Sequence, residues 1–233
     1  MRTAFLPCLI LLSFFLSSCG ESFVKIAERN RAGLDSLQAD MKQLSDLIAS
    51  NPGEVTPSAP LDPSPVFKED EGAGSNTAMV IHERLTEFEK KAGDEDLMDL
   101  FLSNGLENCF IWSTWEEKAF DSFESELQSA LGLRYLIGYK TLEYIAPKVD
   151  AQLNYTIGGA RLGVYVFDRE KKEIVCAFPL AATSSETVNY QYRESGGDQA
   201  QSAQSWARSS LWENLRKAIL PALAEKTGGT FEL

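Results

Sequence analysis

The chain has 233 residues with 34 acidic and 22 basic side chains, which gives a formal net charge of −12. A surface with this excess of negative charge repels nucleic acid and gains nothing electrostatically from anionic lipid headgroups. We therefore expect no nucleic-acid partner, and any attachment to a membrane has to come from apolar groups.

The first eighteen residues have the pattern of a secretory signal peptide. Arg2 provides a positive start, and an uncharged apolar run of thirteen residues extends from Ala4 to Leu16. A helix of that length is too short to cross about 30 Å of hydrocarbon. We assign residues 1–18 to a signal peptide and exclude them from the fold.

The segment Leu16-Ser17-Ser18-Cys19 resembles the lipobox of bacterial lipoproteins. In that family the cysteine thiol receives a diacylglyceryl group, signal peptidase II cleaves before the cysteine, and many hosts acylate the new amino terminus. The resemblance implies that Cys19 is lipidated and holds the protein in a bacterial membrane, facing the periplasm or the exterior. Gly20 stands where an aspartate commonly retains such proteins at the inner membrane, so the outer membrane is favoured if the host is Gram-negative. The alternative is an ordinary secretory signal whose cleavage region contains a cysteine.

Residues 19–50 are predicted to form a lipid-anchored helix that is separate from the rest of the chain. Apolar side chains recur there at spacings of three and four residues, which is the seam of a coiled coil, at Leu34, Leu37, Met41, Leu44 and Ile48. This seam predicts a short coiled coil and a homo-oligomer formed through it. The alternative is an amphipathic helix that packs on its own domain.

Residues 51–76 contain five prolines together with glycine, serine and acidic residues. Such a composition cannot bury a core, and it predicts a disordered linker. We expect the following residues, 77–233, to fold as one globular domain without the preceding helix.

The pattern of that domain predicts an α+β fold, in which an antiparallel β-meander packs with helices in two layers. Helices are predicted over 78–88, 97–102, 114–131 and 199–226, and strands over 133–145, 160–168 and 173–182. The charged residues 169–172 predict a hairpin connection between the last two strands, and Pro179 indicates that the final strand either lies at an edge or breaks at that residue. The meander, with its "VYVFD" and "AFPLAA" strands, resembles a domain of uncharacterised bacterial envelope proteins for which no catalytic residues are known.

Once Cys8 is removed and Cys19 is lipidated, Cys109 and Cys176 remain. An oxidising compartment permits them to form a disulfide. The apolar sequence around each one is equally consistent with a buried free thiol.

No arrangement of residues in the sequence identifies an active site. A Ser-His-Asp triad would need His82, the one histidine, which lies in a predicted helix, and there is no Gly-x-Ser-x-Gly segment and no zinc spacing. Asp94, Glu95, Asp96 and Asp99 lack the glycine and the final glutamate of a calcium loop. The nearest candidates for a carboxylate pair are Glu117, Asp121 and Glu124, on one predicted helix face. We assign no catalytic residue, metal ligand or cofactor.

Tyrosines concentrate in the predicted strands. Tyr135, Tyr139 and Tyr165 predict either aromatic packing within the domain or an exposed binding face for a protein or glycan. With the lipobox, these observations favour a non-enzymatic interaction or assembly module with an envelope protein partner. The alternative is an envelope hydrolase or ligand-binding domain whose site residues are dispersed along the chain.

Overall fold

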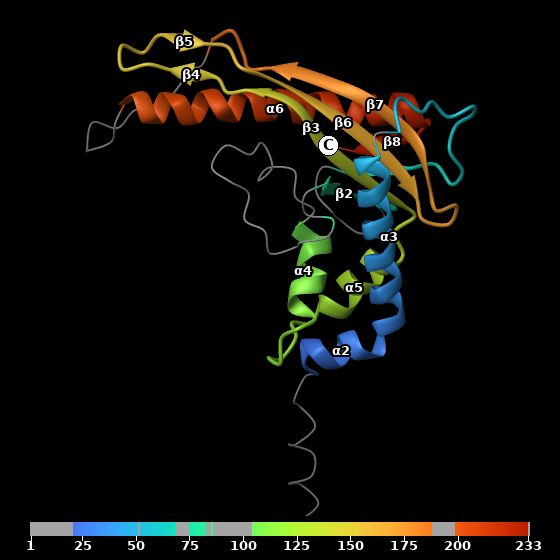
Figure 1. The fold of residues 1–233 in the computed structure, drawn as a ribbon. Helices are drawn as coiled ribbons and strands as arrows, with labels where there is room; N and C mark the ends of the chain where they lie inside the picture. The colour runs from blue at the N-terminus through green and yellow to red at the C-terminus, as the bar shows by residue number, and fades with distance from the viewer. Residues whose placement is uncertain are drawn as a thin grey trace, which may run out of the picture.

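The computed structural model describes residues 21–50, 52–68, 75–82, 85, 104–187 and 199–232. The fold is α+β (Figure 1). Its elements in chain order are α2 (Phe23–Arg29), α3 (Arg31–Ala49), β1 (Val66–Lys68), β2 (Thr77–Ile81), α4 (Asn104–Trp112), α5 (Phe123–Leu131), β3 (Tyr135–Ile145), β4 (Lys148–Val149), β5 (Tyr155–Thr156), β6 (Gly159–Asp168), β7 (Glu173–Thr183), α6 (Gln199–Thr227) and β8 (Thr230–Glu232).

The central sheet has four strands in the order β2-β3-β6-β7. β3, β6 and β7 are the three predicted strands, joined in antiparallel pairs, and β7 with Pro179 lies at the edge as expected. β2 pairs with β3 in parallel, so the sheet is mixed and is not a purely antiparallel meander. β4 and β5 form a small hairpin between β3 and β6, and β1 pairs with β8.

The predicted helix over 78–88 is wrong where the structure describes it, because Thr77–Ile81 is strand β2. Ala78 and Val80 face one side of the sheet while Met79 packs on the other, which is the two-residue alternation of a strand. The helix predicted from residue 114 begins later, as α5 at Phe123. The helix predicted over 97–102 lies outside the described residues.

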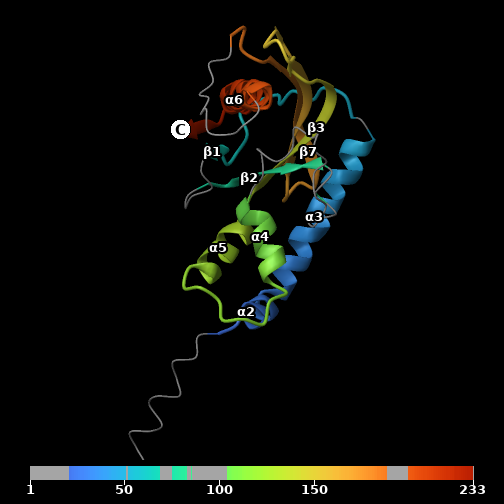
Figure 2. The ribbon, with the colours of Figure 1, turned by 90° about the vertical axis from the view of Figure 1, so that its left-hand side faces the viewer.

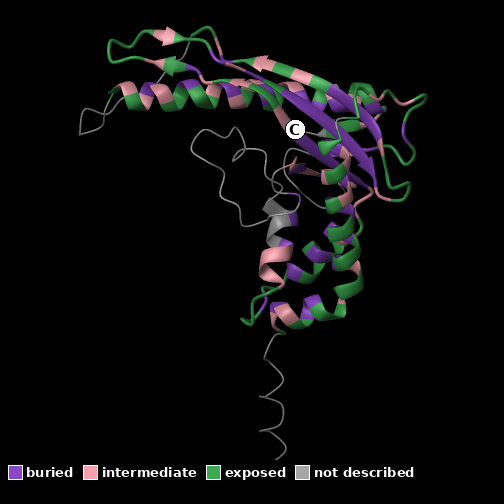
Figure 3. Ribbon diagram, viewed as in Figure 1, coloured by how far each residue is buried: buried purple, intermediate pink, exposed green. Residues whose placement is uncertain are grey.

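Helices cover both faces of the sheet, so the fold has three layers and not the two expected. Leu136 and Phe167 pack with the helices of the N-terminal half, whereas Tyr135 and Ile137 on alternate positions pack with α6. Figure 2 shows the strands between α3 and α6. The buried positions concentrate on these strands (Figure 3).

The N-terminal helix is not a separate element. The whole predicted coiled-coil seam is buried within the chain itself, with Leu37, Met41, Leu44 and Ile48 fully enclosed in a core shared with the sheet and the neighbouring helices. The contact is so close that a Cβ atom on Gly138 of β3 would lie 2.5 Å from Cδ1 of Ile48. The alternative, an amphipathic helix packed on its own domain, describes α3 correctly, and the seam is not free to form a coiled coil.

The described part of the predicted linker also belongs to the domain. Val55 pairs with Ala177 of β7 through two backbone hydrogen bonds, of 2.9 and 2.8 Å. The amide of Leu61 donates to the carbonyl oxygen of Thr227 at 2.9 Å, and the side chain of Phe67 is fully buried beside α6. Prolines therefore lay this segment across the surface as an extended strap and do not leave it disordered.

Helix α6 is confirmed at Gln199–Thr227, against the predicted 199–226. Its buried stripe includes Leu211, Leu215, Ile219 and Leu223. Trp206 does not belong to that stripe, because its side chain is exposed.

Candidate functional site

The tyrosines proposed as a binding face lie in the core instead. Tyr135, Tyr139 and Tyr165 are all buried. The hydroxyl of Tyr135 donates to the carbonyl oxygen of Pro63 at 2.7 Å, and the hydroxyl of Tyr139 lies 2.6 Å from the sulfur of Met79. Burial raises the pKa of all three phenols above the ordinary value. The sheet is covered on both faces, so these rings serve as core aromatic packing.

The two remaining cysteines are buried and do not form the disulfide considered above. They are buried in different layers, Cys109 of α4 with the N-terminal helices and Cys176 of β7 on the side of α6. Burial raises the pKa of Cys176 to about 11. Because the thiolate is the reactive form of cysteine, this buried thiol is not a nucleophile.

His82 follows β2 and contacts α3, but the contact is unsuitable for nucleophilic catalysis. Its Nε2 lies 3.4 Å from Oγ of Ser45 and 3.3 Å from the carbonyl oxygen of the same residue. A carbonyl oxygen only accepts hydrogen bonds, so that contact requires the proton on Nε2. A protonated Nε2 cannot remove the hydroxyl proton of Ser45.

The carboxylates considered for glycosidic chemistry are not brought together in a cleft. Glu117 and Asp121 lie in the connection before α5, and Glu124 on α5 forms an ion pair of 3.1 Å with Arg29. All three are exposed. The acidic residues at 94–99 lie outside the described residues, and the described ranges contain no cluster of three His, Cys, Asp or Glu side chains that could hold a metal ion.

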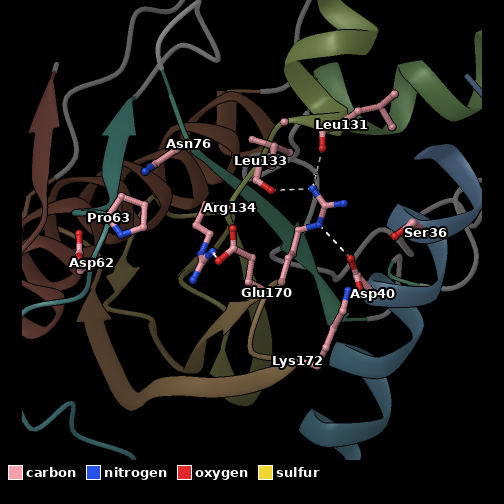
Figure 4. Close-up of a pocket in the computed structure, with 12 residues that line it drawn as sticks. Ser36, Asp40, Asp62, Pro63, Asn76, Leu131, Leu133, Arg134, Glu170 and Lys172 are labelled. Atoms are coloured by element: carbon pink, nitrogen blue, oxygen red, sulfur yellow. Dashed lines mark hydrogen bonds and ion pairs between the residues drawn. The ribbon is translucent and has the colours of Figure 1, made fainter. Parts of the chain in front are cut away.

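A charged pocket of about 720 Å³ lies between α3, the α5–β3 connection and the β6–β7 hairpin (Figure 4). Asp40 of α3 is its most buried carboxylate, and Nε of Arg169 donates to it at 3.0 Å. Lys172 also forms an ion pair with Asp40. The guanidinium of Arg169 donates further to the carbonyl oxygens of Leu131 and Leu133, at 3.0 and 2.6 Å.

A second ion pair lies beside the first. Arg134 contacts Asp168 at 2.9 Å and also forms an ion pair with Glu170. Asp168 is fully buried, and its carboxylate accepts the backbone amides of Glu170 and Lys171 at 2.9 and 3.1 Å. The carboxylates Asp40, Asp168 and Glu170 are thus already bonded to cations of the same chain, so the network fastens α3 and β3 to the β6–β7 turn.

Exposed apolar side chains are found on and beside the β4–β5 hairpin, which extends alongside α6 (Figure 1). We name the side chains of Ile145, Leu153 and Ile157 the arm patch; they are 57%, 37% and 45% exposed. Leu153 has a positive φ of 64° in the hairpin turn. Ile145 ends β3, Leu153 lies in the hairpin turn and Ile157 follows β5. A contiguous exposed apolar surface is typical of an interaction site.

Helix α6 holds the β4–β5 hairpin in place, although the hairpin projects from the central sheet. Gln204 of α6 donates from Nε2 to the carbonyl oxygen of Pro147 at 2.6 Å and accepts the amide of Val149 at 2.8 Å. A side chain at Gly158 would collide with the backbone of Pro147 and Ile145, so glycine permits the tight return into β6. Sequence reasoning missed this surface because β4 and β5 are only two residues each and carry no alternation.

Comparison with known proteins adds little. No family model and no curated protein matches the chain. A solved structure of the hypothetical protein CT253 from Chlamydia trachomatis is similar over 71% of this chain and 95% of that chain, with 13% identity and a TM-score of 0.28. A likeness this weak carries no argument. In the described part of the chain no helix is both long and apolar enough to cross a membrane.

Proposed function

We propose that the protein is a lipid-anchored envelope protein that acts as a non-enzymatic interaction or assembly module. Acyl chains on Cys19 attach it to a bacterial membrane, and the arm patch binds an envelope protein. The observation that carries the binding role is the exposure of three aliphatic side chains on and beside a hairpin that Gln204 holds in place.

Rigidity of the hairpin supports a binding role. A surface that is already ordered loses little conformational entropy when a partner binds, so more of the apolar contact contributes to affinity. The formal charge of −12 leaves the arm patch as an apolar surface on an acidic protein. The net negative charge repels other acidic proteins and so opposes non-specific association through the arm patch. Such repulsion favours binding to one specific partner.

The charged pocket is the feature that would serve the alternative, a hydrolase or ligand-binding domain. General acid–base chemistry on a glycoside needs two carboxylates, one of which can be protonated. In the pocket Asp40 contacts both Arg169 and Lys172, and Glu170 contacts Arg134. Both carboxylates are therefore already bonded to cations of the same chain and do not face a substrate as a pair. The binding role is therefore the one we propose.

The anchor is tested by mass spectrometry of the mature amino terminus. We expect a diacylated or triacylated Cys19 and a protein that fractionates with membranes. The Cys19→Ala variant should lose both the modification and the fractionation. An unmodified Cys19 in the mature protein, or unchanged membrane attachment of the variant, would contradict the anchor.

The binding role is tested by crosslinking in the host envelope. We expect the intact lipoprotein to crosslink to a defined protein, and Ile157→Asp to reduce that product at least fivefold. Ser209→Asp is the matched control, since it adds the same charge at an exposed position of α6 outside the arm patch. Equal crosslinking of both variants would contradict a role for the arm patch.

A further inference from the structure

The connection between α4 and α5 lies beside the start of α2, at the end of the molecule away from the β4–β5 hairpin (Figures 1 and 2), and it carries a second group of exposed apolar residues. Trp115 and Phe120 are in the connection between α4 and α5, and their side chains are 42% and 39% exposed. We name these two side chains the base patch. These two aromatic rings are exposed to solvent beside the first described residues of the chain, which follow Cys19 closely in the sequence.

The base patch rests on a rigid aromatic cluster. The buried ring of Phe23, the first residue of α2, lies 5.8 Å from the ring of Trp115 and 5.3 Å from that of Phe120, both edge to face. Trp112 lies 4.9 Å from Phe120, and Phe123 lies 4.7 Å from Phe23. Edge-to-face pairs at these distances are favourable, so packing against the other rings of the cluster holds the two exposed rings in place.

The backbone fixes the base patch to the first residues of α2. The amides of Phe23 and Val24 donate to the carbonyl oxygens of Glu117 and Trp115, at 3.2 and 3.0 Å, and the amide of Ala119 donates to the carbonyl oxygen of Glu21 at 2.9 Å. The first amides of a helix have no partner within the helix, and here the α4–α5 connection supplies their acceptors. The base patch therefore cannot move independently of the start of α2.

Chain length places this patch next to the anchor. Phe23 follows Cys19 by four residues, and four residues span at most about 14 Å when fully extended. We infer that the base patch lies in the interfacial region of the same bilayer that holds the lipid on Cys19, with Trp115 at the headgroup level. This inference rests on the lipid anchor of the proposed function. Tryptophan is favoured at that depth because its ring is apolar and its N–H remains hydrogen-bonded.

The surrounding charges define the kind of membrane contact. Glu116, Glu117 and Asp121 flank the base patch and are exposed, with Lys118 as the exposed cation among them. Anionic headgroups would repel this end, so the contact is made by the rings and not by charge attraction. Two or three acyl chains already provide stable attachment. The base patch then determines orientation, and it directs the arm patch away from the bilayer.

The test is tryptophan quenching in vesicles. Full-length lipidated protein, purified from its host membrane, is reconstituted into phosphatidylcholine vesicles whose acyl chains carry bromine. We expect Trp115→Phe to remove at least half of the bromine-dependent quenching, with unchanged circular dichroism. Trp206→Phe, a matched change at the exposed tryptophan of α6, should leave the quenching unchanged. The quenching should also persist in high salt.

Three results would overturn the inference, and they separate it from the proposed function. An unmodified Cys19 would overturn both together. On a lipidated protein that remains bound to vesicles, quenching that Trp115→Phe does not alter would overturn this inference alone. A dimer in solution that Trp115→Glu dissociates would show that a second copy, and not the bilayer, covers the base patch.

Discussion

The two faces of the central sheet are covered in different ways. One face is covered mainly by α3, which also packs against α2 and α5, and the other is covered mainly by the single helix α6. Both coverings contain apolar residues at spacings of three and four, and both stripes are buried. The stripe predicts that a helix is amphipathic, but it does not say what the helix packs against. That is why α6 was placed correctly in the domain and α3 was not.

The two faces also differ in their polar contacts. α3 is joined to the β6–β7 turn by the buried carboxylate of Asp40, which contacts Arg169 and Lys172. α6 is joined to the strands and the hairpin by neutral amides, since Gln204 contacts Pro147 and Val149 and the side chain of Asn214 donates to Thr183 at 2.9 Å. We expect loss of the Asp40 charge to weaken the attachment of α3 to the β6–β7 turn.

Removal of the N-terminal layer should have the largest effect. A chain that starts at Ser75 lacks α2, α3 and the strap, so the faces of Leu136, Phe167 and Phe123 that pack against them would be exposed to water. We expect it to aggregate or to show no cooperative thermal transition, whereas a chain that starts at Glu21 should melt cooperatively. Cooperative melting of the shorter chain would support the separate domain that the sequence predicted.

Matched truncations of buried leucines compare the two layers directly. Leu44 of α3 and Leu223 of α6 are both fully buried. Leu44→Ala and Leu223→Ala should each lower the free energy of unfolding by about 2 to 5 kcal/mol, measured by denaturant titration. If α3 were a peripheral helix, Leu44→Ala would lower the free energy of unfolding by less than about 1 kcal/mol. Such a result would show that α3 contributes less to stability than α6.

The elements that could be predicted from the sequence are those with a clear local pattern. β3, β6 and β7 are rich in β-branched and aromatic residues, and α6 has a long stripe of period 3.6. β2 was missed because Ala78, Ile81 and Leu85 also fit helical spacing, and its strand geometry comes from pairing with β3, more than fifty residues later. Pairing over that separation leaves no local signal.

The candidate surfaces were harder to predict for a related reason. Burial of Tyr135 and Tyr139 follows from a sheet covered on both faces, and that depends on α3 and α6 together. Phe120 falls within the helix predicted over 114–131, but it is exposed in a loop beside Phe23, which is nearly a hundred residues earlier. The sequence contains one indication of this surface, because five aromatic residues lie between 110 and 123. A short buried helix has room for fewer aromatic rings on its buried face.

Neutralisation of Asp40 should have the next largest effect. Asp40→Asn leaves the largely buried guanidinium of Arg169 without its counter-charge, and we expect the free energy of unfolding to fall by about 3 kcal/mol. Asp46→Asn is the control on the same helix, since its ion pair with Lys42 is exposed, and it should cost about 0.5 kcal/mol or less. Equal effects of the two variants would show that the charged network does not stabilise the N-terminal face.

The smallest effect is expected at the hairpin turn beside α6. Asp150 accepts the side-chain amide and the backbone amide of Asn154, both at 2.8 Å, and the backbone amide of Gln152 at 2.9 Å. These hydrogen bonds, that of the Asn154 side chain first, lower the pKa of Asp150 below the ordinary 3.8. A lowered folded-state pKa means that the ionised group stabilises the turn fully above the ordinary value, and that this contribution is lost as the pH falls through the lowered one. Asp150 is exposed, so the change should be local. Amide chemical shifts of Gln152 and Asn154 should therefore move together below about pH 4 in the native chain and should not show this transition in Asp150→Ala. A transition retained in that variant would assign it to another group and would leave the turn without a role for the carboxylate.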